Sequence, residues 1–219
     1  VDALGQPRNI DLPVKYQYLG VPNGIRDVGA FERQSLQPLV LNNDFDVDLR
    51  VWDVVTAGST SRDATHNTTG AANSGSAHVS ATNLSTSSER LGISQCIHLP
   101  GPAVFELNGW GRGTGTQVVG GDRANLHWEY RRNGGENCTG TPDGFGTLTL
   151  SNGPSWRRAA EPALIEVTGS NWGDSPSIKV ILAAQEFGAS GTTTTDAWFD
   201  GITLEVQLSD RIFADGFEP

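Results

Sequence analysis

The chain has 219 residues and a formal net charge of −10. A negative surface of this kind repels phosphate backbones and anionic lipids, which excludes nucleic acid as an expected partner. The chain contains 27 glycines and no methionine, and no window shows helical periodicity, so we predict a mostly β protein. This length can bury one sizeable core, and we therefore expect one main domain.

The sequence contains no stretch that predicts a membrane span. No apolar stretch approaches the roughly 20 residues that a transmembrane helix needs, and no basic and apolar leader opens the chain. The chain begins with Val1 and not with methionine, which we interpret as the boundary of a piece of a longer protein. We expect no membrane span, and we count the upstream part of the same precursor or neighbouring copies among the candidate partners.

The expected elements follow one another as short strands. Residues 1–38 are rich in turn-forming residues and prolines, and we expect no core there. From residue 39 to residue 208 short β-like runs alternate with turn clusters, which predicts an all-β, antiparallel β-sandwich. The polar stretch from Gly58 to Ser76 is expected to be a surface loop, and residues 209–219 an acidic tail. The expected strands lie near residues 39–41, 51–56, 77–82, 92–99, 103–112, 124–131, 146–150, 163–168, 177–187 and 197–206.

Alternation within three of these strands separates an inward apolar set from an outward polar set. The outward residues are Glu106, Asn108, Trp110, Arg112, Asn125, His127, Glu129, Arg131, Lys179 and Gln185. A flat aromatic face beside planar hydrogen-bonding side chains suits sugar rings, so these residues are candidate carbohydrate ligands on one shared face. The same pattern is typical of the solvated face of any antiparallel sheet, and a one-residue change of register would exchange the two sets.

The two cysteines, Cys96 and Cys138, show no spacing that would build a zinc site. A disulfide is their simplest use, and two buried free thiols are the alternative. A disulfide would indicate an oxidising compartment and therefore a secreted or cell-surface protein.

Five segments, taken in order, resemble one known family. They are LNNDFD followed by Trp52, NSGSAHVSA, SQCIHLPGPAVFELNGWGR, ANLHWEYRRNGGENCTG and WFDGITLEV. Together they resemble carbohydrate-binding-module-like domains with the galactose-binding-like jelly-roll fold, over about residues 39–206. The chain departs from the family pattern at Asp46, where the family usually has glutamate, and at Gly201, where it often has a second aspartate.

The resemblance also gives a use to the alternating aspartates of NNDFDVD. It implies that the first strand lies beside the last, which would bring Asp46 close to Asp200. Calcium takes six to eight oxygen ligands, and related domains commonly hold a structural calcium there. The resemblance thus implies Asp46 and Asp200 as calcium ligands, with Asp44 and Asp48 as lesser candidates. The alternative is that these aspartates form a solvated row or cap turns.

Two further phrases concern the ends of the chain. DALGQPR followed by DVGAFE resembles the closing coil of secreted right-handed parallel β-helix proteins, and IFADGFE resembles an ending of secreted proteins from some Gram-negative bacteria. The resemblance implies that the chain is the carboxyl end of a longer secreted protein.

These observations predict a non-catalytic, secreted module that binds carbohydrate and is stabilised by calcium. The alternative is a structural module for adhesion or assembly that ends a larger bacterial surface protein and binds no sugar. Glycosidases need two carboxyl groups about 5 to 9.5 Å apart, for which Glu106 and Glu129 would be the candidate pair. We do not expect that pair to be catalytic, because both would lie on a sheet face beside arginine.

Overall fold

The computed structural model describes residues 39–55, 59–82, 91–115, 123–185 and 194–207. The chain divides into two compact units, Val1–Gln37 and Pro38–Pro219, and the described residues all belong to the second. The predictions for the β-helix-like coil in residues 1–38 and for the tail in residues 209–219 lie outside the described residues. Within the described ranges no helix is long and apolar enough to cross a membrane.

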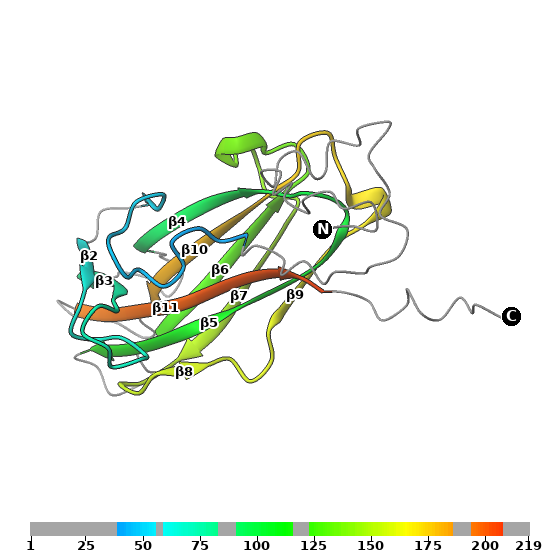
Figure 1. Ribbon diagram of the computed structural model, residues 1–219. Coiled ribbons are helices and arrows are strands. Elements are labelled where there is room, and N and C mark those ends of the chain that lie inside the picture. The colour runs from blue at the N-terminus through cyan, green and yellow to red at the C-terminus, as the bar shows by residue number, and fades with distance from the viewer. Residues whose placement is uncertain (1–38, 56–58, 83–90, 116–122, 186–193, 208–219) are drawn as a thin grey trace, which may run out of the picture. The chain divides into compact units, whose positions relative to one another are not determined.

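The described unit consists of two antiparallel sheets, as Figure 1 shows. The five-stranded sheet has the order β1 (Asp53–Val54), β4 (Leu91–His98), β10 (Ser177–Gln185), β6 (Arg123–Arg131) and β7 (Gly144–Ser151). The six-stranded sheet has the order β2 (Ser59–Asp63), β3 (Ser76–Thr82), β11 (Thr194–Val206), β5 (Ala103–Gly115) and β8 (Arg157–Arg158), and β9 (Ala163–Val167) also pairs with β5. Two short 3-10 helices, η1 (Gly135–Asn137) and η2 (Gly169–Asn171), lie in connections. The predicted all-β, antiparallel sandwich is confirmed.

The core lies between the two sheets and is built from alternate residues of the long strands. Phe105 and Leu107 of β5 and Leu126 of β6 have no exposed surface, and fully burying such a side chain stabilises the fold by roughly 1.5 to 3 kcal/mol. At Gly111 of β5 the sheets come so close that a Cβ atom would lie 2.8 Å from the Cβ of Leu150. Only glycine fits that approach without a shift of one sheet.

The predicted facing of the long strands is confirmed. In the ladder between β10 and β6, Ile178 is opposite Tyr130 and Val180 is opposite Trp128, and directly opposed residues share one face of a sheet. Ile178, Val180 and Tyr130 belong to the core, and Trp128 packs against it. The alternating polar residues therefore face outward, as the alternation predicts.

Two local predictions are wrong. Residues 39–41 form no strand, because the backbone N–H and C=O of Leu41 are engaged by the side chain of Gln95, at 2.8 and 2.9 Å. The stretch from Gly58 to Ser76 includes a strand, β2, which pairs with β3 at the edge of the six-stranded sheet. An edge strand needs a partner on one side only and tolerates polar residues, so its sequence resembles that of a loop.

The beginning and the end of the sandwich lie side by side, as the resemblance implies. The pairing of β11 with β5 shifts register between Asp200 and Thr203, and Gly201 in that interval adopts φ +55°. The N–H of Ile202 then donates a hydrogen bond of 3.0 Å to the carbonyl of Asn43. The bulge in the last strand thus attaches the first described segment to the sandwich.

Candidate functional site

The outward polar residues fall on two different sheets. Those of β6 and β10 lie on the five-stranded sheet, whereas Glu106, Asn108, Trp110 and Arg112 of β5 lie on the six-stranded sheet. The prediction of one face shared by three strands is therefore wrong, because alternation fixes the facing of a strand but not its neighbours. Glu106 and Glu129 face outward from opposite sheets, so they do not flank one bond as a glycosidase pair would.

The outer face of the five-stranded sheet carries an exposed aromatic ring. Phe145 of β7 is opposite Glu129 of β6, which is opposite Lys179 of β10. The Phe145 side chain is 69% exposed, and its ring centroid lies 6.4 Å from that of the buried His127. We call the set Phe145, Glu129, Arg131 and Lys179 the Phe145 platform.

Charge on the Phe145 platform is fixed in place. Arg131 Nη2 donates a hydrogen bond of 2.7 Å to Glu129 Oε2. Burial raises the pKa of Glu129, but the hydrogen bond from Arg131 and the charges of Arg131, His127 and Lys179 outweigh burial, so the pKa lies below its usual value. Glu129 is therefore ionised at neutral pH and presents a planar carboxylate paired with a planar guanidinium.

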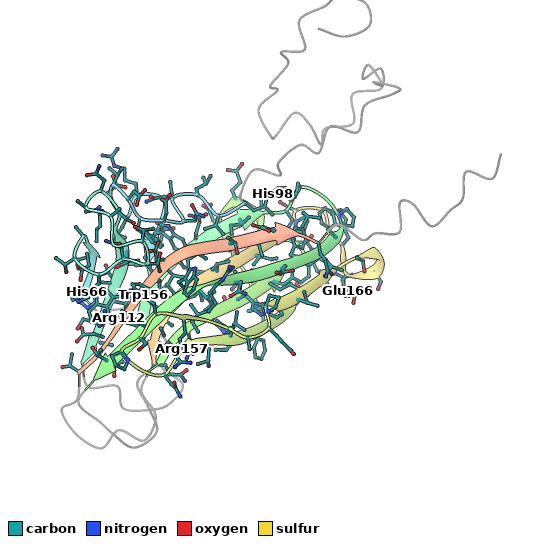
Figure 2. All side chains as sticks on the ribbon, turned by 60° about the horizontal axis from the view of Figure 1, so that its bottom comes forward. His66, His98, Arg112, Trp156, Arg157 and Glu166 are labelled. Carbon is teal, nitrogen blue, oxygen red and sulfur yellow. A yellow bond between two sulfur atoms is a disulfide. The ribbon has the colours of Figure 1, made fainter. Side chains whose placement is uncertain are left out.

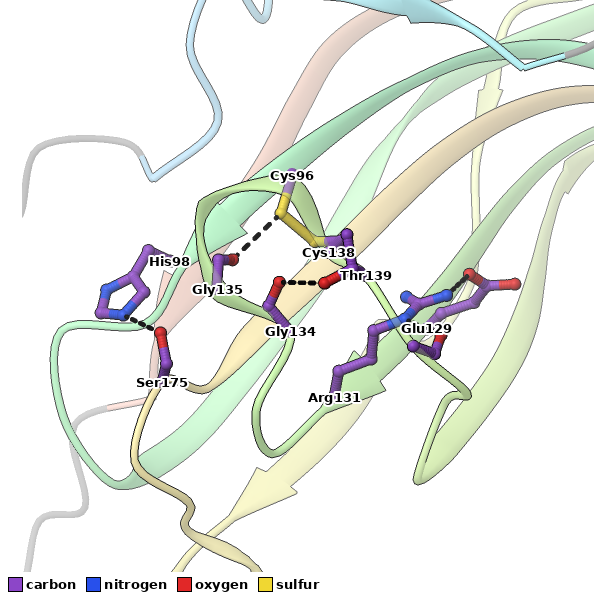
Figure 3. The surroundings of a disulfide bond; sticks show 10 residues. Cys96, His98, Glu129, Arg131, Gly134, Gly135, Cys138, Thr139 and Ser175 are labelled. Atoms are coloured by element: carbon purple, nitrogen blue, oxygen red, sulfur yellow. Dashed lines mark hydrogen bonds and ion pairs between the residues drawn. A yellow bond between two sulfur atoms is a disulfide. The ribbon is translucent and has the colours of Figure 1, made fainter.

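A disulfide-bonded loop lies beside the Glu129–Arg131 pair of the Phe145 platform (Figure 3). Cys96 and Cys138 form a disulfide with Cα atoms 5.6 Å apart, which confirms the predicted pairing. Arg131 Nε donates a hydrogen bond of 2.9 Å to the carbonyl of Gly140, in the same loop. Arg131, which pairs with Glu129, thus also holds the loop. The position of the loop therefore depends on the disulfide and on the hydrogen bond from Arg131.

Two of the predicted ligand residues are buried on the same face of the sheet. His127 and Asn125 are 1% and 2% exposed. His127 Nδ1 lies 3.0 Å from Thr147 Oγ1. Asn125 Nδ2 donates a hydrogen bond to Gln185 Oε1. These two side chains are covered by their neighbours, whereas Phe145 is exposed and Glu129 and Lys179 are half-buried on the same face.

The outer face of the six-stranded sheet has a tryptophan that is covered by other side chains. The ring of Trp198 stacks on His78, with centroids 4.6 Å apart, and lies 5.1 Å from His66. The guanidinium of Arg112 lies 4.9 Å from the Trp198 ring; Arg112 and His66 are labelled in Figure 2. The apolar run around Trp198 predicts a core position, but the residue lies on the outer face and is buried there by these neighbours. It is no free platform for a sugar.

The two remaining candidates on β5 differ in access. Trp110 is 36% exposed, with the guanidinium of Arg158 5.9 Å from its ring. Asn108 is buried, and its Oδ1 accepts a hydrogen bond of 2.8 Å from the N–H of Gly109. Trp110 is therefore the accessible aromatic residue of this group.

A cavity of about 290 Å³ opens at the sandwich edge. It is lined by Trp128, Tyr130, Arg132, Asp143, Gly144, Leu164, Ile165, Glu166 and Asn171. Alternation in the strand ANLHWEYRR indicates Trp128 and Tyr130 as inward residues, and no sequence pattern indicates the other lining residues. Asp143 and Gly144 are turn-forming residue types and indicate a loop. Nothing in the sequence indicates that this loop faces β9.

The four aspartates proposed for calcium occupy different environments. Asp200 is 3% exposed, and its Oδ2 accepts hydrogen bonds of 2.9 and 2.6 Å from the N–H and Oγ1 of Thr68. Burial raises the pKa of Asp200 despite these bonds, and the charge of Asp44 raises it further. Asp46 is exposed.

Asp48 has a partner of its own, since its Oδ2 lies 2.6 Å from Arg50 Nε. Across the described residues, no three histidine, cysteine or acidic side chains are grouped so as to hold a metal ion. Calcium binding by these aspartates stays a prediction.

The fold is that of a jelly-roll β-sandwich, and known structures share it. The chain aligns over 78% of its length with a proposed sugar-binding protein from Bacteroides thetaiotaomicron, with 9% identity, a TM-score of 0.51 and the whole of that chain covered. It aligns over 78% of its length with the CBM22-1–CBM22-2 tandem domain of Paenibacillus barcinonensis Xyn10C, with 14% identity and a TM-score of 0.52, and it spans half of that chain. No protein-family model matches the sequence, and no curated protein matches it.

Proposed function

We propose that this chain is a secreted, non-catalytic module that binds carbohydrate on the Phe145 platform. The observation that supports this most directly is the exposed Phe145 ring, held on a sheet face beside the Glu129–Arg131 pair and Lys179. The jelly-roll fold, shared with proteins described as sugar-binding and carbohydrate-binding, agrees with the proposal. The disulfide supports an oxidising compartment and hence secretion.

Stacking on the Phe145 ring and hydrogen bonds to the polar groups would both contribute to binding. The apolar face of a pyranose ring would stack on Phe145, which removes apolar surface of both partners from water. Hydroxyl groups of the sugar would donate to Glu129 and accept from Lys179, in planar or charge-assisted hydrogen bonds. The Arg131 contact holds Glu129 in place before the ligand arrives, so little side-chain entropy is lost on binding.

A polysaccharide panel in native affinity gels, followed by titration calorimetry with any retarding glycan, tests the proposal on the full chain. Phe145→Ala should weaken binding about tenfold, since about 1.4 kcal/mol of ring contact is lost. Trp110→Ala is the matched control, because it removes an accessible aromatic ring from the other sheet. Absence of retardation by every polysaccharide would refute sugar binding. An equal loss in both variants would refute the assignment to the platform.

The alternative function, a structural module for adhesion or assembly, depends on residues 1–38 and 209–219. These lie outside the described residues, and no observation on the described sandwich favours it over sugar binding.

A further inference from the structure

Arg62 is a charged residue at a core-facing position of an edge strand. In the ladder between β2 and β3 it is opposite Ala77, and Ala77 has no exposed surface and belongs to the core. Directly opposed residues share a face, so Arg62 is turned toward the inside of the sandwich at its edge. A guanidinium there loses water, which is costly unless protein groups replace the lost hydrogen bonds.

Backbone carbonyls replace them. Arg62 Nε donates a hydrogen bond of 2.8 Å to the carbonyl of Phe45, and Nη2 donates to the carbonyl of Asp46 and, at 3.4 Å, to that of Ser74. The three oxygens come from two segments, one that precedes β2 and one that follows it. Hydrogen bonds from a charged donor are about twice as strong as neutral ones, so this contact ties both segments to the strand.

The backbone around Arg62 is shaped to receive the guanidinium. Gly75 leaves the necessary space, because a Cβ atom there would lie 2.4 Å from the carbonyl oxygen of Phe45 and 2.7 Å from Arg62 Nε. Phe45 adopts φ +52°, which is rare and unfavourable for a residue with a side chain. Its buried ring lies 5.5 Å from that of Trp52, which holds it in this conformation.

The groups around Arg62, together with the Asp200 carboxylate, do not fit a calcium site. Calcium requires six to eight oxygens at about 2.3 to 2.6 Å, several of them from carboxylates. The Asp46 carbonyl oxygen is already an acceptor for Arg62, and Asp200 Oδ2 already accepts two hydrogen bonds from Thr68. A divalent cation placed on the carbonyls of Phe45 and Asp46 would also lie beside the guanidinium, and like charges at such distances repel strongly in a partly buried site.

We propose that Arg62 is the resident cation of this site and takes the structural role that a calcium ion would otherwise have. It fastens residues 39–55 to β2 and to the turn at Ser74, and the domain does not depend on calcium for its stability. This inference concerns the stability of the fold and is independent of the proposed sugar binding.

Thermal unfolding of the full chain, in millimolar calcium chloride and in excess EGTA, is the first test. The melting temperature should be the same in both solutions, and calorimetric titration with calcium chloride should show no saturable uptake. Arg62→Ala should lower the melting temperature by about 5 °C or more, a shift that corresponds to losing two or more charged hydrogen bonds in a domain of this size. Arg50→Ala is the matched control, because Arg50 lies in the same segment with a side chain 86% exposed, and its removal should change the melting temperature little.

Arg62→Lys should fall between the two, since one ammonium group keeps the charge but cannot span carbonyls from both segments. A wild-type chain that loses stability in EGTA or takes up calcium would overturn the proposal, as would equal melting temperatures for Arg62→Ala and Arg50→Ala. If Arg62→Ala fails to fold, the EGTA comparison on the wild-type chain and the position of Arg62→Lys decide.

Discussion

At the scale of single residues, Asp63 organises the outer face of the six-stranded sheet. Its Oδ1 accepts a hydrogen bond of 2.7 Å from the N–H of Thr65, and its Oδ2 contacts His66 Nδ1 at 2.7 Å and accepts from Trp198 Nε1 at 2.9 Å. Burial raises the pKa of Asp63, but the hydrogen bonds from Thr65, His66 and Trp198 outweigh burial and hold the pKa well below the usual range. One carboxylate therefore holds both Trp198 and His66, whose ring lies against that of Trp198.

Substitution of this carboxylate should have a pH-dependent effect. Because the folded-state pKa of Asp63 lies below the unfolded value near 3.9, its stabilisation is complete above that value and is lost as the pH falls through the folded-state pKa. We expect Asp63→Asn to lower the free energy of unfolding by about 1 to 3 kcal/mol at neutral pH, and the difference from wild type to shrink in strong acid. Urea unfolding over a pH series measures it, with Asp53→Asn, at an exposed position, as control. A difference that stays constant with pH would contradict this assignment.

At the scale of elements, the disulfide connects β4 to the loop after β6. That loop also contains η1, and its Gly140 carbonyl is held by Arg131, which pairs with Glu129. The covalent bond and the Phe145 platform are thus coupled through one arginine. The free energy of unfolding and the affinity for the ligand should therefore both decrease when the disulfide is lost.

Removal of the disulfide tests this coupling. The bridged cysteines are 42 residues apart in the sequence, for which the loop-entropy model gives a loss of about 4 kcal/mol in the free energy of unfolding. We expect that loss for the double variant Cys96→Ala/Cys138→Ala in urea unfolding, together with weaker retardation by the glycan that wild type binds. Reducing agent should destabilise wild type and leave the double variant unchanged. Equal unfolding midpoints for oxidised and reduced wild type would speak against a structural role.

Alternation predicts the strands with a buried face and fails for the others. The sequence predicts which residues of β5, β6 and β10 face the core, because apolar and polar residues alternate along each of these strands with period two. The polar β2 is missed, because its place at an edge removes the need for an apolar pattern. Arg62 in that strand is invisible for the same reason, since its three acceptors are backbone carbonyls.

The candidate site is only partly predictable, because it depends on which strands are neighbours. Glu129, Arg131 and Lys179 are found from their alternation. Phe145 is not, because β7 reads as an ordinary short strand, and its exposure follows only from its place opposite Glu129. The acidic residues of the edge cavity come from separate connections and strands that the fold alone brings together.

At the scale of the whole molecule, the described sandwich closes its own core. The first described segment contacts three strands: β11 through Asn43 and Ile202, β4 through the bonds of Gln95 to Leu41 and through the pairing of β1, and β2 through Arg62. The buried residues of the described core run from Val40 to Leu204. A hydrophobic core formed within one compact unit is what allows a domain to fold independently.

Deletion of residues 1–37 should therefore leave the sandwich folded. Because every member of the described core lies in the second unit, we expect residues 38–219 to unfold in one cooperative transition, with a melting temperature within about 4 °C of the full chain, a difference equivalent to about 1 to 2 kcal/mol. The retained unit should also form the Cys96–Cys138 disulfide and bind the same glycan with the same affinity. Differential scanning calorimetry and affinity gels on both chains measure these properties. A fragment that aggregates or melts far below the full chain would show that residues 1–37 complete the fold, and it would favour the structural-module alternative over an independent sugar-binding domain.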